Sequence, residues 1–327
     1  MNNMKDAEFP SQQLHTPQGH YQPVQDDEID LRELFAAIWA GKWLITGVTT
    51  VFAVASVIIA LSLPNIYKSE VLLAPADNQQ QGGLGALAGQ FGGLAAMAGI
   101  NLGGGNTDQT TLALEVLKSR EFITGFIDRH DILVPLMAAE GWDRATNKLE
   151  LDADVYDEKS GQWVREVKAP FQPKPSAQEA YKEFIEESLS VGKDKKTGMV
   201  TLGINHYSPE IAQQWATWLV EDLNEVMRQR DQAEATKSIQ YLESQIEKTR
   251  LADLKSMLYQ LVEEQTKILM FAEVRDEYVF KTIDPAVVPE EKASPRRALI
   301  CVLGVMLGGL LSFIFVLIRY FSKKDCT

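Results

Sequence analysis

Cysteine is nearly missing from this chain. The 327-residue sequence has two cysteines, Cys301 and Cys326, and none in the 234 residues from Pro64 to Arg297. A segment without cysteine carries neither disulfides nor an exposed thiol, which suits an oxidising compartment, although chance explains the pattern equally well. Disulfide-stabilised folds and cysteine-based metal sites are therefore excluded for residues 64–297.

Residues typical of catalysis and metal binding are also scarce. The four histidines lie in unrelated contexts, at His15, His20, His130 and His206, and their spacing is not that of metal ligands. Neither a Gly-x-Ser-x-Gly nor a Walker motif occurs. Neighbouring acidic residues are typical of solvated faces rather than of catalytic pairs. We therefore predict no catalytic residue, no metal site, no cofactor and no enzymatic activity.

Positive charge is in deficit. The formal net charge is −13, and residues 64–297 contain 26 Lys and Arg against 37 Asp and Glu. Such a segment has no basic field for nucleic acid or for an anionic polymer. Nucleic-acid binding is therefore excluded as the function.

Two long apolar runs hold many of the hydrophobic residues. Leu44 to Leu63 is a run of 20 residues without a charge, and Ala298 to Ile318 is a run of 21. As helices rising about 1.5 Å per residue, each would extend roughly 30 Å, the thickness of the hydrocarbon core of a bilayer. A buried core helix is shorter and amphipathic. We therefore predict transmembrane helices at 44–63 and 298–318.

Two spans place both termini on one side of the membrane. The long segment 64–297 then lies on the other side, because loops of this length cross largely regardless of their charge. The positive-inside rule decides little here, since basic residues flank both spans on both sides. We expect cytoplasmic termini, including a short C-terminal tail at 319–327.

The residues before the first span divide into two parts. Residues 1–25 are rich in Gln, Pro and His and lack an apolar period, so we predict a disordered cytoplasmic tail. Residues 26–43 have apolar side chains at helical spacing, which predicts an amphipathic interfacial helix. Trp39 and Trp43 would lie at the membrane interface, as aromatic residues flanking spans commonly do.

A Gly- and Ala-rich segment follows at 82–105, with ten glycines, five alanines and no charge. A phosphate-binding loop would need a Lys followed by Ser or Thr, which is missing. A third span has the required length, but so many glycines weaken insertion, and a third span would separate the termini. We predict a flexible apolar loop near the membrane surface.

Residues 64–207 have the pattern of one mixed domain. A strand is expected at 66–74, helices at 110–132 and after the prolines near 175, and a hairpin at 189–206 around a polar turn. Residues 64–207 are enough for a single core. The predicted fold class is an α+β domain with one very long extended helix, flanked by two transmembrane helices.

The long helix is expected at 208–283. Ser208 can cap it with Pro209 in the first turn, and no further Gly or Pro occurs before Pro285. An uninterrupted helix to about Lys281 would be roughly 105 Å long. The residues after 284, up to 297, would return to the membrane as a Pro-rich extended segment.

The apolar stripe of this helix predicts association with other helices. It is interrupted by a polar stretch and resumes with a shift of phase, and a lone helix cannot bury such a stripe. The partner helices can come from the same chain or from neighbouring copies, and an autonomous two-stranded coiled coil stays an alternative. The expected packing residues are Ile239, Leu242, Ile246, Leu254, Leu258 and Leu261.

Several stretches together resemble the Wzz family of bacterial polysaccharide co-polymerases. They are DEIDLRELFAAIWAGKWLI, KDKKTGMVTLGINHYSPEIAQQW and EEQTKILMFAEVRDEYVFKTIDPAVVPEEKASPRRALI, together with the glycine-bearing second span. The resemblance covers nearly the whole chain from Asp26 onward. Each piece alone is a weak signal, whereas the combination and its order are specific.

The resemblance implies a regulator of the chain length of lipopolysaccharide O antigen or a related glycan. It implies an inner-membrane protein with cytoplasmic termini, a periplasmic domain and a ring of identical subunits. Its implied partners are a Wzy-type polymerase, the glycan linked to undecaprenyl pyrophosphate, and membrane lipid. The chain has nine residues after Ile318, so it resembles the class without a fused kinase. The insert at 82–105 departs from the family pattern.

The resemblance offers no catalytic residue, but it directs attention to the membrane-proximal strip and the second span. The two arginines would lie at the outer interface, where they anchor the chain or meet a lipid phosphate or the carrier pyrophosphate. The two glycines, one turn apart, allow close approach of the first span, through Ser56 and Ala60, or of the polymerase. The candidate contact residues are Pro285, Pro289, Pro295, Arg296, Arg297, Gly304 and Gly308.

Two other functions stay open at this point. A two-span sensor would need a cytoplasmic output domain, which neither the leader nor the tail supplies. A structural adaptor of a polysaccharide export complex fits the same sequence features. We predict a homo-oligomeric co-polymerase that regulates chain length, with these two functions as alternatives.

Overall fold

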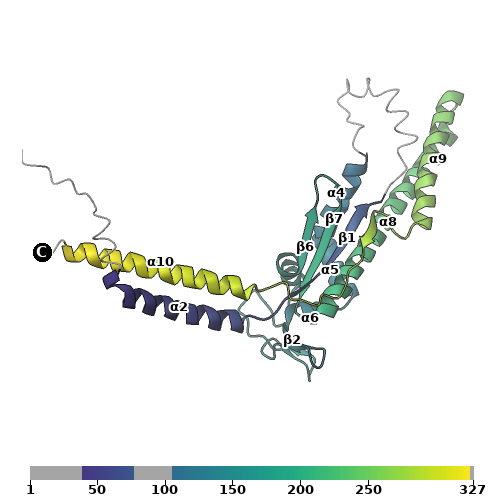
Figure 1. The fold of residues 1–327 in the computed structure, drawn as a ribbon. Coiled ribbons are helices and arrows are strands. Elements are labelled where there is room, and N and C mark those ends of the chain that lie inside the picture. Colours follow the sequence, from purple (N-terminus) through teal and green to yellow (C-terminus); the bar gives the residue numbers. More distant parts are fainter. Residues whose placement is uncertain (1–38, 77–104, 325–327) are drawn as a thin grey trace, which may run out of the picture. The chain divides into compact units, whose positions relative to one another are not determined.

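The structure is a computed structural model, and it describes residues 39–76 and 105–324. The chain divides into two compact units (Figure 1). One contains the membrane-length helices up to Ser56 and from Cys301, and the other contains residues 57–300. The tail 1–25, most of the predicted interfacial helix 26–43 and nearly all of the segment 82–105 lie outside the described residues.

Two helices have the length and composition of membrane spans. Helix α2 covers Lys42–Ser62 and helix α10 covers Arg297–Lys324. Their most apolar parts have mean hydropathies of 2.4 and 2.7, and most of their apolar side chains are exposed. Apolar helices that bury little against their own chain need another apolar surrounding, so the prediction of two candidate membrane helices at these positions is confirmed.

A four-stranded antiparallel sheet forms the centre of the second unit, with strand order β6-β7-β1-β8. Strand β1 pairs with β7 from Tyr67 opposite His206 to Leu73 opposite Val200. The predicted strand and the predicted hairpin are both present in this sheet. The strands are β1 (Tyr67–Pro75), β6 (Leu189–Lys193), β7 (Val200–His206) and β8 (Phe280–Asp284).

Helices cover one face of the sheet (Figure 1). The side chains of Val71 and Leu73 alternate with exposed or half-buried neighbours along β1 and enter the core, as the two-residue period of a strand requires. The core joins this face to Trp215, Leu219 and Leu223 of the long helix, all almost fully buried. The fold is therefore the predicted α+β domain.

The shorter elements pack around this core. The helix expected at 110–132 is divided at Ser119, whose side chain accepts a hydrogen bond from the backbone N–H of Phe122 and so caps a second helix. The elements are α4 (Gly105–Lys118), α5 (Arg120–Arg129), α6 (Leu133–Met137), α7 (Ala177–Glu183), the π-helical turn η1 (Phe184–Ser188), and the small hairpins β2 (Ala139–Asp143) with β3 (Lys148–Leu151) and β4 (Tyr156–Asp157) with β5 (Gln162–Trp163).

The long helix is shorter than the sequence predicted. Helix α8 covers Pro209–Lys248, about 60 Å at the usual rise, and helix α9 covers Ala252–Val274. The chain reverses between them, and α9 returns along the upper part of α8 as a helical hairpin (Figure 1). The expected single helix to about Lys281 is wrong, because the chain already turns back between Lys248 and Ala252.

The reversal needs neither Gly nor Pro. Thr249 and Leu251 adopt extended backbone angles, and the Thr249 hydroxyl donates to the carbonyl of Gln245. Lys248 lies at the end of α8 and Asp253 at the start of α9, where each charge suits the helix dipole. The shift of phase in the apolar pattern coincides with this turn.

The hairpin closes on buried contacts of small residues. Ala235 of α8 and Ala272 of α9 are almost fully buried, and Ile246 is buried near the turn. Small side chains let two helix backbones approach closely, which favours antiparallel packing. Helix α9 of the same chain therefore covers part of the apolar stripe of α8.

Asn224 fixes the segment that follows the hairpin. Its side-chain oxygen accepts hydrogen bonds from the backbone N–H groups of Val279 and Phe280, both at 2.9 Å. Its amide nitrogen donates to the carbonyl of Phe280 at 3.0 Å. All three residues are buried, so no water can replace the lost partners. Asn224 therefore holds the start of β8 against α8.

Replacing Asn224 by Ala is expected to lower the free energy of unfolding by about 3 kcal/mol, because three buried backbone groups lose their partner. Asn205→Ala removes one exposed hydrogen bond, to the Glu187 carbonyl, and serves as the control with an expected loss below about 1 kcal/mol. Denaturant unfolding of the full-length chain in detergent measures both. Equal losses in the two variants would contradict the role of Asn224.

His206 is buried in a neutral state at the end of β7. Its Nδ1 accepts from the backbone N–H of Ser208 at 3.0 Å, so Nε2 carries the proton and donates to the carbonyl of Pro135 at 3.0 Å. Burial lowers the pKa of His206 below the usual 6.5. Protonating Nδ1 would place a second proton against the Ser208 N–H.

The lowered pKa of His206 predicts acid sensitivity. Above pH 6.5 the imidazole is neutral in both states; as the pH falls through 6.5, the unfolded chain takes up a proton that the folded chain refuses. The free energy of unfolding should then fall by at most about 1.4 kcal/mol per pH unit from this group. Thermal unfolding of the full-length chain in detergent from pH 7.5 to 5.5 measures the slope, which should be shallower in His206→Gln. Identical slopes would rule the effect out.

Candidate functional site

The two glycines of the second span face the first span. A side-chain carbon added at Gly304 would lie 2.7 Å from Ser56 Oγ, and one at Gly308 would lie 2.6 Å from Phe52 Cβ. Ala60, the other predicted contact, is almost fully buried. Glycine lets helix backbones approach closely, so this part of α10 is shaped to receive α2.

The Pro-rich segment runs in extended form beside β1. The Ser69 hydroxyl donates to the carbonyl of Val287 at 2.8 Å, and Gln213 donates to the carbonyl of Ala286 at 3.4 Å. Pro285 is exposed, whereas Pro289 and Pro295 are half-buried. The prolines therefore lie along the surface of the domain, and the hydrogen bonds of their neighbours fix their path.

The ends of the two spans meet at one point of the domain. The backbone N–H of Ile66 donates to the carbonyl of Ser294 at 2.9 Å, and the carbonyl of Ile66 accepts from Ala293 at 2.9 Å. Arg297 donates to the side-chain oxygen of Asn65 at 3.2 Å and to the carbonyl of Leu63 at 3.4 Å. The residues that leave the first span and those that enter the second are therefore joined.

Lys292 donates to the same acceptor as Arg297, the side-chain oxygen of Asn65. Its ammonium group donates to Asn65 Oδ1 at 3.1 Å. The side chain of Arg296, the residue before Arg297, is exposed. The sequence analysis singled out the two arginines but missed Asn65 and Lys292. A lone Asn and a lone Lys carry no sequence signal, and only the Ile66–Ser294 bridge brings them together.

The predicted packing residues of the long helix are divided between two helices. Ile239, Leu242 and Ile246 lie on α8, and the last of these is buried. On α9, Leu258 is half-buried, while Leu254 and Leu261 are 42% and 44% exposed. The structure thus leaves part of the predicted stripe without cover in this chain.

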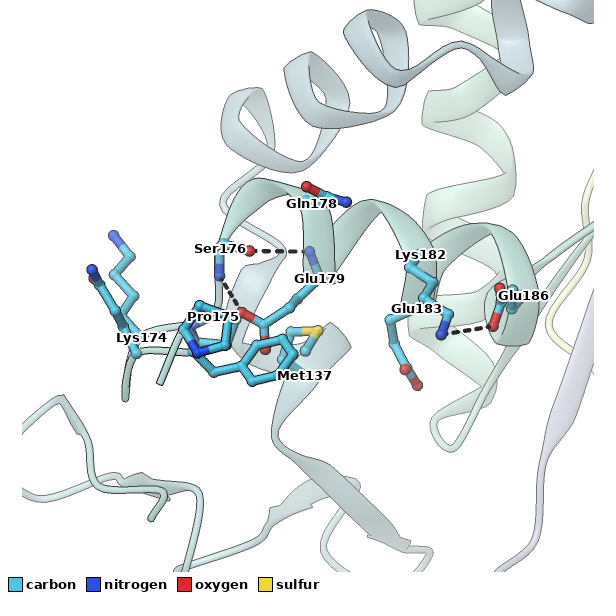
Figure 2. A pocket seen from close by; sticks show the side chains of 12 residues that line it. Met137, Lys174, Pro175, Ser176, Gln178, Glu179, Lys182, Glu183 and Glu186 are labelled. Carbon is cyan, nitrogen blue, oxygen red and sulfur yellow. Dashed lines mark hydrogen bonds and ion pairs between the residues drawn. The ribbon is translucent and has the colours of Figure 1, made fainter. Parts of the chain in front are cut away.

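A cleft of about 900 Å³ lies beside α7 (Figure 2). Figure 2 shows Ser176 and Glu179 joined by two hydrogen bonds, the capping box that begins α7. Glu183 lines the cleft, and burial, followed by the nearby carboxylates of Glu187 and Glu186, raises its pKa. Sequence reasoning did not single out these residues, because polar side chains on a helix surface carry no periodic signal.

Chemistry-bearing groups are sparse elsewhere in the part of the chain that is described. Within residues 39–76 and 105–324, no group of three His, Cys, Asp or Glu side chains is arranged to hold a metal ion. His130 Nε2 donates a hydrogen bond to the Asp222 carboxylate at 3.1 Å, and the ring stacks on Trp218 at 4.3 Å. Arg129 also pairs with Asp222, at 2.6 Å, so this carboxylate is engaged in packing helix α5 on α8.

Leucine at both Gly304 and Gly308 is expected to force the first span away. We expect the variant to lose thermal stability and defined particle size in detergent, because the added side chains overlap Ser56 and Phe52. Gly309→Leu is the matched control, since an added carbon there meets nothing within 4 Å. Differential scanning fluorimetry and light scattering measure both. A double variant as stable as the control would show that this contact is unimportant and would leave the polymerase as the partner of these glycines.

Comparison with known proteins identifies two family models. Residues 27–130 match the model described as chain length determinant protein, Wzz, and residues 249–321 match the model described as G-rich domain on putative tyrosine kinase, GNVR. The second description refers to kinases, and the expected kinase-free class stays a prediction. A search of curated proteins found no significant match.

Two solved structures are similar to the chain at low identity. One is a full-length bacterial polysaccharide co-polymerase, with 14% identity, a TM-score of 0.36, and coverage of 90% of this chain and 99% of that chain. The other is a fragment of WzzB, a polysaccharide co-polymerase from Salmonella Typhimurium, with 12% identity, a TM-score of 0.31, and coverage of 70% and 99%. No argument rests on similarities this weak.

The Wzz match covers the N-terminal part of the chain. It includes the first span, strand β1 and helices α4 and α5, and the second match includes α9, β8 and most of α10. The two matches thus lie at the two ends of the α+β domain, each with one candidate membrane helix. The chain is thus similar to chain length determinant proteins over residues 27–130 and to the GNVR model over residues 249–321.

Proposed function

We propose that this chain sets the modal length of a bacterial surface polysaccharide, the O antigen of lipopolysaccharide or a related glycan. It acts in the inner membrane with a Wzy-type polymerase, which extends the polymer on undecaprenyl pyrophosphate. The observation that carries the proposal is the chain length determinant match over residues 27–130. The candidate spans at both ends of the domain support a membrane location.

The proposed topology follows from the order of the elements. Both termini lie in the cytoplasm, and the domain of residues 64–297 lies in the periplasm, with the helical hairpin as part of it. The described domain contains no cysteine, which suits an oxidising compartment. The first residues after α2 and the last before α10 are joined through Ile66 and Ser294, so one domain surface receives both spans.

The proposed assembly is a homo-oligomeric ring. The α8–α9 hairpin exposes large apolar side chains that this chain does not cover, and exposed apolar patches mark association surfaces. In a ring each contact is heterologous, so one surface of each copy packs on a different surface of the next copy. The exposed side chains are Tyr241, Leu251, Leu254, Met257, Tyr259, Leu261, Met270 and Val274.

A regulator without catalytic groups acts through binding. Contacts with the polymerase or with the growing glycan change how long the two stay together, and the duration of that contact sets the length of the product. The number of copies in a ring multiplies weak contacts by raising the effective concentration of each site. The proposal therefore requires both the assembly and the membrane anchoring.

The test is deletion of the gene, followed by electrophoresis of the lipopolysaccharide. We expect the total amount to persist while the modal ladder is replaced by a broad distribution, and the wild-type gene to restore the mode. A structural adaptor of an export complex would change the amount, and a two-span sensor would change expression. Either result, with an unaltered mode, would contradict the proposed function.

Two matched pairs of substitutions distinguish loss of assembly from a general effect of added negative charge. Leu254→Glu with Leu261→Glu should prevent a defined multimer of the full-length chain in detergent and abolish the mode, because both leucines lie on one exposed face of α9. Ser256→Glu with Gln260→Glu adds the same charge at exposed polar positions of that helix and should keep both. A wild-type chain that light scattering shows to be a stable monomer would argue against the ring.

A further inference from the structure

Two cations, those of Lys292 and Arg297, meet at the junction of the two spans without an anion, and Arg296 precedes Arg297 in the sequence. Lys292, Arg296 and Arg297, here named the basic junction, lie between the end of the domain and the first turn of α10. In the described part of the chain no carboxylate lies within 4 Å of any of them, although the chain has a net charge of −13. A basic group that stays unpaired in an acidic protein is unusual.

Two of these cations share one neutral acceptor. Lys292 and Arg297 both donate to Asn65 Oδ1, at 3.1 and 3.2 Å. Both positive groups therefore lie next to the same oxygen atom, and their mutual repulsion is not offset by a negative charge. An ammonium has three donors and a guanidinium has five, so most of their hydrogen-bonding capacity is left over.

Arg297 has a further unused donor. Its Nε is buried and makes no hydrogen bond, while its terminal nitrogen also donates to the carbonyl of Leu63. Arg296 makes no side-chain hydrogen bond within the described residues, and its side chain is exposed. The junction is thus held in place by Asn65 and Leu63 but is not saturated by them.

The start of α10 adds to the same field. Arg297 is the first residue of this helix, and the start of a helix carries partial positive charge, although the N–H groups of Arg297, Leu299 and Ile300 already donate to backbone carbonyls. Helix starts and clustered Arg and Lys are the two features that most often bind phosphate in proteins. Here they coincide, and an N-terminal carboxylate that would neutralise them is missing from the first turn.

The position indicates the source of the phosphate. The junction lies where α2 ends and α10 begins, and both helices have the length and composition of membrane spans. The phosphate groups of lipids lie at that depth of a bilayer, and basic residues beside a span attract them. A soluble phosphate would find the same donors but would gain nothing from the apolar helices beside them.

We propose that the basic junction binds the phosphate group of a membrane lipid, with Lys292 and Arg296 as donors and Arg297 as the residue that positions them. The site needs α2 and α10 to lie in a membrane, but it does not depend on the role of the protein in chain length. Binding offsets the repulsion between Lys292 and Arg297 and so fixes the angle at which the chain enters the second span.

The test uses the full-length chain in detergent and two lipids that differ only in phosphate. Native mass spectrometry is run with phosphatidic acid and with diacylglycerol of the same acyl chains. We expect phosphatidic acid to bind at a defined stoichiometry and diacylglycerol not to bind. In Lys292→Gln with Arg296→Gln, affinity for phosphatidic acid should fall at least about tenfold, because two charge-assisted contacts are lost.

A matched control removes the same charge elsewhere. Lys248→Gln with Arg250→Gln alters two exposed cations beside the hairpin turn and should bind phosphatidic acid as the wild type does. Thermal unfolding confirms that each variant is folded, and Arg296→Gln alone, which breaks no hydrogen bond, replaces the double variant if that one is unstable. Its affinity should fall by a smaller factor.

Three results would overturn the proposal. The junction variant could bind phosphatidic acid like the wild type, or the control could lose as much affinity, which would show a general effect of charge. Alternatively, inorganic phosphate at low millimolar concentration could displace the lipid completely, which would make a soluble anion the ligand. The lipopolysaccharide ladder is scored separately, so failure of the lipid site is distinguishable from failure of the proposed function.

Discussion

The pairing of β1 with both β7 and β8 is the constraint on which the rest of the domain depends. Strand β1 begins a few residues after the first candidate span, and β8 ends shortly before the Pro-rich segment that leads to the second. Because both strands belong to one sheet, the two ends of the domain are held side by side, and Ile66 and Ser294 continue that contact.

The long helix α8 belongs both to the core over the sheet and to the helical hairpin with α9. Its first half carries Trp215, Leu219 and Leu223 into the core over the sheet, and its second half pairs with α9. Asn224 lies between these halves and binds the returning chain, and farther along the helix the Tyr278 hydroxyl donates to Asp231 at 2.7 Å. Burial raises the pKa of Asp231, so the carboxylate depends on that partner. The hairpin is therefore tied to the domain by polar contacts, which define one position more sharply than apolar contacts do.

Two surface features follow one another along the chain. The α8–α9 hairpin exposes apolar side chains, and the junction beyond β8 carries cations without a carboxylate partner. Under the proposed function, such surfaces would act by binding another copy or another molecule. The cleft beside α7 is a third surface, whose lining of Glu, Lys and Gln provides hydrogen-bond donors and acceptors together.

The amino-acid sequence by itself determined the two spans, the strand at 66–74, the hairpin at 189–206 and the start of α8, because each follows from a local pattern of hydropathy, turn residues or capping. It also predicted the resemblance to the Wzz family, through several weak motifs in a fixed order, and residues 27–130 match that family's model. Tertiary structure alone decided the reversal at Thr249, because no Gly or Pro marks it and the apolar pattern is equally compatible with a partner in the same chain or in another. It alone decided that Asn65 and Lys292 share a site, since 226 intervening residues separate them and only the pairing of the two domain ends brings their side chains within 3.1 Å.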